Sequence, residues 1–305
     1  MKNWFRYIFY ASLVFLVVAL ARADYLIVPK IYHPLNLILS LLLLFAGFLV
    51  NALAWPRVLR QSPFRVKDRE GMASHGMSIF GKYIPGKFWV IMGRAEYLAF
   101  RTEHSRKNLA SLSLDAQFMA VWTALLLGTL GMFFVGGSKI YGIGVLTLFV
   151  MLSLVIFTKL FHKLVQWLLS KLLRRQIEIP HLPLRKALKA MTFYLLSWLT
   201  WSVAFWFLAA SLAPGQIPFS IAFGFALGGS IGILTVFAPG GLGVREGILS
   251  VYLGLAGMAA QEATTIAVAS RLWFLSGEIF IFLTALLLDR HSRKRGGETG
   301  RDWEH

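Results

Sequence analysis

Several ionisable side chains lie within strongly apolar stretches of the sequence, where a charge meets few partners. They are Arg94, Glu96, Arg245, Glu246, Arg271 and Glu278. A charged side chain at the centre of a membrane span costs about 2.5–3.5 kcal/mol on insertion scales, and such residues commonly mark substrate or ion sites. With so many Arg residues, the chemistry predicted is anion binding. A buried ion pair that only fixes helix register is the alternative.

The basic residues accompany two Pro-Gly motifs that interrupt apolar sequence. Pro85-Gly86-Lys87 stands within residues 74–100, and Pro239-Gly240-Gly241 stands within residues 219–260. A helix that restarts after such a break directs its free N–H groups and the positive end of its dipole at the gap. Gly86-Lys87 and Gly243-Val244-Arg245 would each open one such helix. The pattern therefore predicts an anion site, suited to a lipid phosphate, between two broken helices.

The predicted site contains two kinds of residue. Those expected to bind the headgroup are Lys82, Lys87, Arg94, Arg245, Glu246, Arg271 and Glu278. Those expected to break the helices are Pro85, Gly86, Pro239, Gly240, Gly241 and Gly243. We predict no catalytic residue, metal site or cofactor, because Cys is absent and the seven His residues show no metal-ligand spacing. Residues 81–88 resemble a nucleotide-binding P-loop, but Phe88 replaces the Ser or Thr that would hold Mg²⁺. We therefore do not expect nucleotide binding there.

The elements that must position these residues are transmembrane helices. Of the 305 residues, 57% are hydrophobic and 15% are charged, against about 25% charged in soluble proteins. Apolar blocks of about 20 residues match the thickness of a hydrocarbon core. Full spans are expected over the apolar runs at 35–55, 110–135, 140–158, 190–212 and 263–288. We therefore predict an all-α, polytopic transmembrane helix bundle and exclude a soluble enzyme.

The distribution of basic residues predicts the orientation of the bundle. The net charge is +17, and residues 56–109 and 159–189 hold 11 and 8 Lys or Arg residues. The segments between them are poor in basic residues, so both termini and both basic segments are expected in the cytoplasm. No soluble basic domain is present to bind nucleic acid, so the expected partners are anionic membrane lipids. Residues 159–175 read as a basic amphipathic helix, either bound to lipid or simply extending the preceding span.

Topology leaves two interpretations of the interrupted segments. Residues 74–100 either lie on the cytoplasmic face or dip into the membrane and return. Residues 219–260 form either one re-entrant helical hairpin, giving about six full spans, or two spans, giving eight. The spans before them run in opposite directions, which is typical of an inverted repeat over about 30–135 and 185–290. We predict one integral membrane domain over residues 1–290 and a basic cytoplasmic tail over 291–305.

The N-terminal apolar run also has two readings. Ala21-Arg22-Ala23 looks like a signal-peptide cleavage site. Retention of residues 1–23 as a first span is the preferred interpretation, because many spans follow and none needs a separate signal. The later topology is the same in both cases.

The motifs around the two breaks resemble those of a known membrane family. Residues 81–89, with Gly93-Arg94, and residues 238–247, with Ser270-Arg271-Leu272-Trp273, are similar to the lysylphosphatidylglycerol synthase transmembrane-domain family. The resemblance implies a flippase-like inner-membrane bundle with re-entrant helices. It also implies that Lys87, Arg94, Arg245, Glu246 and Arg271 surround a headgroup cavity. The soluble aminoacyl-transferase domain of bifunctional members is absent from this sequence, so synthesis of lysyl-lipid is not expected.

These observations together predict a lipid translocator and not an enzyme. An anionic phospholipid or a polyprenyl-phosphate-linked lipid would cross the bacterial cytoplasmic membrane with its headgroup held between the two motifs. Two alternatives stay open: a membrane-embedded transferase of polyprenyl-linked glycan or glycolipid synthesis, and a scaffold for such a synthase. Enzymes of lipid or glycan synthesis are the expected protein partners in these cases.

Overall fold

A computed structural model describes residues 29–84, 88–135, 139–157, 184–235 and 238–299. All regular structure in these ranges is helical, which confirms the predicted fold class. The first expected span, the amphipathic segment 159–175 and the break at Pro85-Gly86-Lys87 lie outside the described residues.

Five long helices stand where apolar runs predicted spans. They are α2 (Pro34–Gln61), α5 (Arg106–Phe134), α6 (Lys139–Phe157), α8 (Leu184–Leu212) and α11 (Ala260–Thr299). Four of them, α2, α5, α8 and α11, contain apolar stretches long enough to cross a membrane, and α6 is a shorter apolar helix. The chain is therefore a multi-pass membrane protein. Several helices are longer than the predicted spans, because polar residues at their ends continue the helix beyond the apolar stretch.

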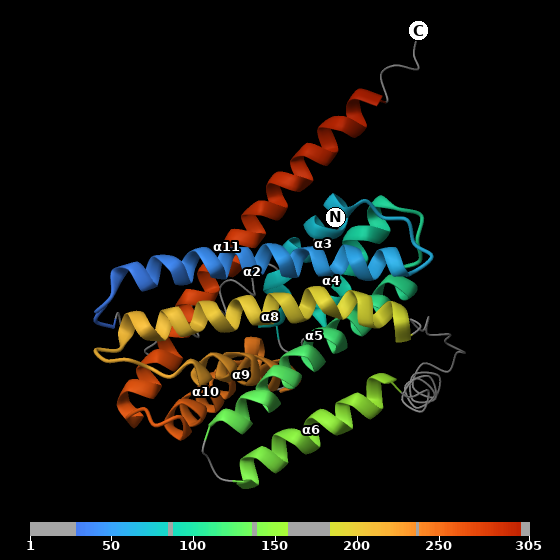
Figure 1. The fold of residues 1–305 in the computed structure, drawn as a ribbon. Helices are drawn as coiled ribbons and strands as arrows, with labels where there is room; N and C mark the ends of the chain where they lie inside the picture. The colour runs from blue at the N-terminus through green and yellow to red at the C-terminus, as the bar shows by residue number, and fades with distance from the viewer. Residues whose placement is uncertain (1–28, 85–87, 136–138, 158–183, 236–237, 300–305) are drawn as a thin grey trace.

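Helices α2 and α8 form the central pair and run antiparallel along the bundle (Figure 1). At one end the Tyr32 N–H donates to the Ser211 carbonyl at 2.8 Å. Further along, the Ser40 hydroxyl donates to the Ala204 carbonyl at 2.8 Å. Small residues such as Ser40 and Ala204 allow close approach of the two helices, as is common between membrane helices.

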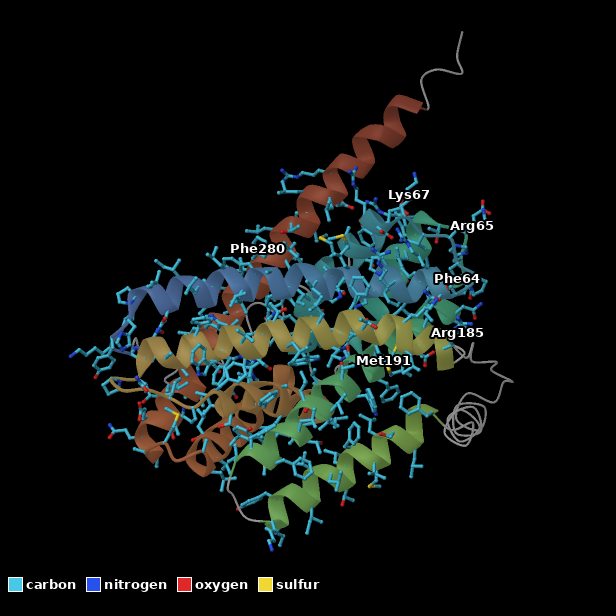
Figure 2. The ribbon with its side chains drawn as sticks, in the orientation of Figure 1. Phe64, Arg65, Lys67, Arg185, Met191 and Phe280 are labelled. Carbon is cyan, nitrogen blue, oxygen red and sulfur yellow. The ribbon has the colours of Figure 1, made fainter. Side chains whose placement is uncertain are left out.

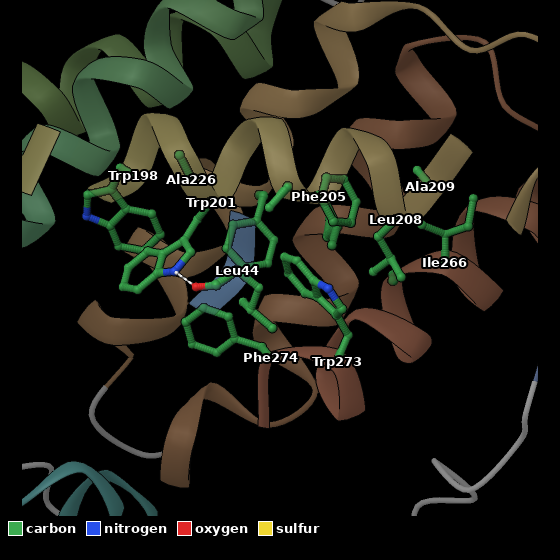
Figure 3. Packing of buried hydrophobic residues seen from close by; sticks show 14 of the residues in the cluster. Leu44, Trp198, Trp201, Phe205, Leu208, Ala209, Ala226, Ile266, Trp273 and Phe274 are labelled. Atoms are coloured by element: carbon green, nitrogen blue, oxygen red, sulfur yellow. Dashed lines mark hydrogen bonds between the residues drawn. The ribbon is translucent and has the colours of Figure 1, made fainter. Parts of the chain in front are cut away.

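The main core packs aromatic side chains from α2, α8 and α11 together (Figure 3). The Trp201 indole donates to the Leu44 carbonyl at 3.3 Å and lies edge-on to Phe274, with ring centroids 5.2 Å apart. Gly47 faces the same indole, since a Cβ there would lie 2.5 Å from the Trp201 ring. This aromatic layer forms one wall of the cavity described below.

The two interrupted segments are each a short hairpin-like arrangement. The first contains α3 (Asp68–Met77), the 3₁₀ turn η1 (Ile79–Tyr83) and α4 (Trp89–Arg101). The second contains η2 (Phe219–Ile221), α9 (Ala222–Leu234), η3 (Pro239–Gly241) and α10 (Val244–Leu255). At 1.5 Å per residue, helices of 12 or 13 residues extend only about 20 Å and cannot cross a ~30 Å core. Since α9 and α10 also pack against each other, the structure favours the re-entrant interpretation of the second segment.

The two segments approach the central helices from opposite ends. In Figure 1, α3 and α4 lie beside one end of the α2–α8 pair, and α9 and α10 lie beside the other end. Helix α11 crosses between them, packing against α3 as well as α10. It continues without a break to Thr299, past the start of the predicted tail. The division into repeats stays a prediction from sequence.

Candidate functional site

A cavity of about 420 Å³ lies where the two interrupted segments meet. Its volume is within the ~300–1,000 Å³ of typical small-ligand sites. Four cationic side chains from four different elements line it: Lys82, Arg94, Arg245 and Arg271. None of its described lining residues is acidic, and most of the rest are apolar or aromatic. The cavity is therefore an apolar chamber with positive charge concentrated on its wall.

The second break brings η3 directly against η1. Gly240 has φ of 60°, and a Cβ there would lie 2.5 Å from Tyr83 Cε1 and 2.9 Å from Arg271 Nη2. A left-handed backbone is costly for residues with a Cβ, and here the space is also filled. Only glycine therefore allows this contact between the two interrupted segments.

The start of α10 is stabilised from within the chain. The Gly243 N–H donates to Glu246 Oε2 at 2.8 Å, which is one half of a capping box. Glycine has no side chain to supply the other half. The Glu246 carboxylate occupies this helix end. One of the free N–H groups that the sequence analysis expected to bind a ligand is therefore already used.

Arg271 is held between the break and this carboxylate. Its Nη1 donates to the Gly240 carbonyl at 3.0 Å and lies 3.9 Å from Glu246 Oε1. Its guanidinium also stands over the Tyr83 ring, 5.1 Å from the centroid. Arg271 thus joins α11 to both η1 and η3.

Glu278 neutralises a second cation. One carboxylate oxygen forms an ion pair with Lys82, and the other accepts a hydrogen bond from Tyr83 Oη at 2.6 Å. Glu278 is 1% exposed, so this pair fixes η1 to α11 in the protein interior. Neither Glu278 nor Glu246 lines the cavity; both sit behind the cations that do.

Two guanidinium groups on the cavity wall form no ion pair with a described acidic side chain. Arg245 lies over two rings, 4.6 Å from the Phe225 centroid and 4.7 Å from the Phe274 centroid. Its Nε and Nη2 atoms lack a hydrogen-bond partner among the described residues. Arg94 lies 5.8 Å from the Trp55 ring, and its Nε also lacks such a partner. Both arginines are 6% exposed, so their charge is available to a ligand in the cavity and not to bulk water.

Among the further polar residues that line the cavity and were not predicted from sequence, two have unpartnered buried atoms. His75 on α3 and Tyr194 on α8 are each 2% exposed. Both His75 ring nitrogens and the Tyr194 hydroxyl lack a hydrogen-bond partner among the described residues. Helix α3 is not a spanning helix; burial there lowers the pKa of His75, and the charges of Arg94 and Lys82 lower it further. The imidazole is therefore neutral at pH 7, able to donate one hydrogen bond and accept another.

Most of the predicted site residues come together in this way. Lys82, Arg94, Arg245 and Arg271 share the cavity, and Glu246 and Glu278 contact two of them. Lys87, with Pro85 and Gly86, lies outside the described residues. Glu96 points away from the site and pairs with Arg106 at 3.3 Å on a partly exposed surface.

Comparison with known proteins identifies a family. A family described as the lysylphosphatidylglycerol synthase TM region matches residues 3–276. No curated protein matches the chain.

Proposed function

This chain belongs to the lysylphosphatidylglycerol synthase TM-region family, and from that premise we propose that it translocates a lipid with an anionic headgroup. The family membership supports a role in membrane lipid metabolism. The observation that carries the finer proposal is the convergence of four cations, and no described acid, on one cavity inside the bundle. The headgroup phosphate would sit against Arg245, Arg271 and Lys82, with the acyl or prenyl chains outside among apolar helices.

The geometry also supports the way such a site would be used. Arg245 rests on aromatic faces, a contact worth about 0.5–2 kcal/mol, and not on a carboxylate that a phosphate must displace. Lys82 pairs with Glu278 and Arg271 lies beside Glu246, and neither acid lines the cavity. These contacts orient the two cations that do line it. The cavity therefore attracts an anionic headgroup. Because two of its cations are already paired with acids, its affinity stays low enough for the headgroup to leave. Transport of this kind is passive or coupled to an ion.

We propose the bacterial cytoplasmic membrane as the location, with both termini on the cytoplasmic side. The basic residues Arg65, Lys67 and Arg185 lie at the same end of the bundle (Figure 2). An excess of Lys and Arg in short loops marks the cytoplasmic face. This end carries the loop between α2 and α3 and the start of α8.

The test is a reconstituted lipid-translocation assay. Vesicles containing tail-labelled phosphatidylglycerol would be exposed to a membrane-impermeant quencher with wild type, Arg245→Gln or the control Arg106→Gln. Wild type and the control should translocate at the same rate. Arg245→Gln should be at least about tenfold slower, the equivalent of losing one ~1.5–3 kcal/mol charged hydrogen bond. Equal rates for all three proteins, or none above empty vesicles, would contradict the proposal.

The same vesicles separate translocation from the other candidate functions. A membrane-embedded transferase would leave a covalently altered lipid in the extract after incubation with polyprenyl-phosphate sugar. A scaffold would tolerate loss of the cavity cations and depend on its outer helical surfaces. Translocation predicts an unchanged lipid and dependence on Arg245.

A further inference from the structure

The cationic side chains on the cavity wall divide into two groups by the aromatic rings that they contact. Lys82, Arg245 and Arg271 form the first, because Lys82 and Arg271 share the Tyr83 ring and Lys82 and Arg245 share the Phe274 ring. Arg94 is not part of that arrangement. It lies on α4 over Trp55 of α2, and its companions on the wall are His75 and Tyr194.

No described residue supplies a hydrogen-bond partner to the polar atoms of the second group. All three side chains are more than nine-tenths buried. The Arg94 Nε, both nitrogens of His75 and the Tyr194 hydroxyl lack hydrogen-bond partners among the described residues. Buried polar atoms are normally satisfied, and a cluster of exceptions indicates a partner that binds there. Arg94 supplies charge, and the tyrosine hydroxyl and neutral imidazole can donate, so the missing partner is an anionic acceptor.

We propose that Arg94, His75 and Tyr194 form a second anion subsite, and that the transported lipid carries two anionic groups on its headgroup. This inference rests on the proposed function and specifies its substrate class. One oxyanion, the phosphodiester, would occupy the Lys82, Arg245 and Arg271 group. The other, a terminal phosphate or carboxylate, would accept hydrogen bonds from the second group.

The same wall disfavours an aminoacylated lipid. Lysyl-phosphatidylglycerol places ammonium groups on its headgroup, and these need carboxylate or carbonyl partners. The acids nearest the cavity, Glu246 and Glu278, lie behind it and are engaged by Gly243, Arg271, Lys82 and Tyr83. An ammonium group would therefore meet cations with no facing acid among the described lining residues.

The experiment compares lipids that differ only at the far end of the headgroup. Purified full-length protein in a non-ionic detergent would bind dioctanoyl phosphatidylglycerol, its terminal phosphate ester phosphatidylglycerol phosphate, or dioctanoyl lysyl-phosphatidylglycerol, each measured by native mass spectrometry. Wild type should bind the doubly anionic lipid at least about tenfold more tightly than phosphatidylglycerol, the gain expected from one further charge-assisted contact. Lysyl-phosphatidylglycerol should bind most weakly.

Variants of the second group locate the preference. Arg94→Gln should reduce the affinity ratio of the two anionic lipids to below about threefold, and Tyr194→Phe, which keeps the ring and removes one donor, should give an intermediate ratio. Arg245→Gln should weaken both lipids and keep the ratio, and the exposed control Arg106→Gln should change neither. Because the readout is a ratio, a general loss of affinity in a less stable variant cancels.

The outcomes separate this inference from the function on which it rests. Equal affinity of wild type for the two anionic lipids overturns the second subsite and leaves translocation of a singly anionic lipid standing. An unchanged ratio in Arg94→Gln also overturns it. Failure to bind any of the three lipids contradicts the proposed function itself, and the second subsite with it.

Discussion

The two interrupted segments supply the same cavity by different physical means. In the second segment the backbone is fixed by glycine, since Gly240 and Gly243 both have positive φ and Gly240 packs directly on Tyr83. In the first segment the position of η1 depends on side chains, through the contacts of Lys82 and Tyr83 with Glu278. One half of the site is therefore built by backbone conformation and the other by a buried polar network.

This difference affects what each half presents to a ligand. The second segment contributes Arg245, whose guanidinium lies against the rings of Phe225 and Phe274. The first contributes Arg94 and His75, whose side chains include polar atoms without a described hydrogen-bond partner. If the halves descend from one repeat, they have kept the break and diverged in their polar content. Substitutions should therefore act through networks in the first segment and through packing in the second.

The largest effect is expected from breaking the network that holds η1. Glu278→Gln leaves the Lys82 ammonium without its counter-charge, and removing one partner of a buried pair typically costs about 3–5 kcal/mol. Lys82 is partly exposed, with 26% of its side chain accessible, so the low end of that range applies. Chemical unfolding of the purified protein in detergent measures the loss.

A double variant tests whether the pair is the cause. Lys82→Met with Glu278→Gln removes both charges, and replacing a buried pair by less polar side chains is often nearly neutral. It should recover at least half of the stability lost in Glu278→Gln. Additive losses would show that η1 is not anchored by this pair.

Packing at the second break comes next. Gly240→Ala combines a left-handed backbone with a Cβ that overlaps Tyr83, and should cost about 2–4 kcal/mol. Gly243→Ala is the matched control, because its φ is 79° but nothing lies within 4 Å of its Cβ position. It should cost about 1–2 kcal/mol from strain alone. The same unfolding measurement applies, and equal costs would refute the close contact between η3 and η1.

The difference in pH-dependent stability between wild type and a His75 variant probes the first segment. Because burial and nearby cations lower the pKa of His75, the unfolded chain binds its proton more readily than the folded one. As pH falls below about 6.5, proton binding to His75 in the unfolded chain therefore lowers the free energy of unfolding of the protein. Above that pH His75 causes no such loss. Between pH 7 and pH 5 the wild type should lose about 1–2 kcal/mol more than His75→Gln. Parallel pH profiles for the two proteins would mean that the imidazole is accessible to protons when folded.

The smallest effect concerns the ring shared by two cations. Phe274→Leu removes the face beneath Lys82 and Arg245, whereas Phe45→Leu removes a ring that stacks on Phe280. The first should destabilise the protein by at least about 1 kcal/mol more than the second, from cation–π contacts of about 0.5–1 kcal/mol each and from ring contacts with Phe48, Trp201 and Phe225. Thermal unfolding of the two variants side by side provides the comparison. Equal losses would mean that the ring serves only as packing.

Much of the fold follows from local sequence. The long described helices lie where apolar runs predicted spans, because span length is set by bilayer thickness. The break around residues 239–243 was predictable as well, since Pro and Gly act on the backbone where they stand. Arg94, Arg245 and Arg271 could be singled out because charge within apolar sequence needs a reason.

The partners of these residues could not be predicted, because they depend on tertiary contacts. Glu278 shares helix α11 with Arg271, yet it pairs with Lys82, 196 residues away in sequence. His75 and Tyr194 carry no local signal; a histidine in a polar stretch and a tyrosine in an apolar span look ordinary until packing leaves them unsatisfied. The capping role of Glu246 was likewise hidden, although a Gly followed three residues later by Glu gives a hint of it.

The most direct test asks whether the two segments share one chamber that an anionic lipid enters. The chain contains no cysteine, so single-cysteine variants are unambiguous. Ile91→Cys on α4 and Leu234→Cys on α9 place a thiol on the cavity wall in each segment, and Lys107→Cys on the exposed start of α5 serves as the control. Modification by a water-soluble thiol reagent would be timed with and without dioctanoyl phosphatidylglycerol. The lipid should slow modification of both wall positions and leave the control unchanged; protection of only one wall position, or of neither, would contradict a shared headgroup chamber.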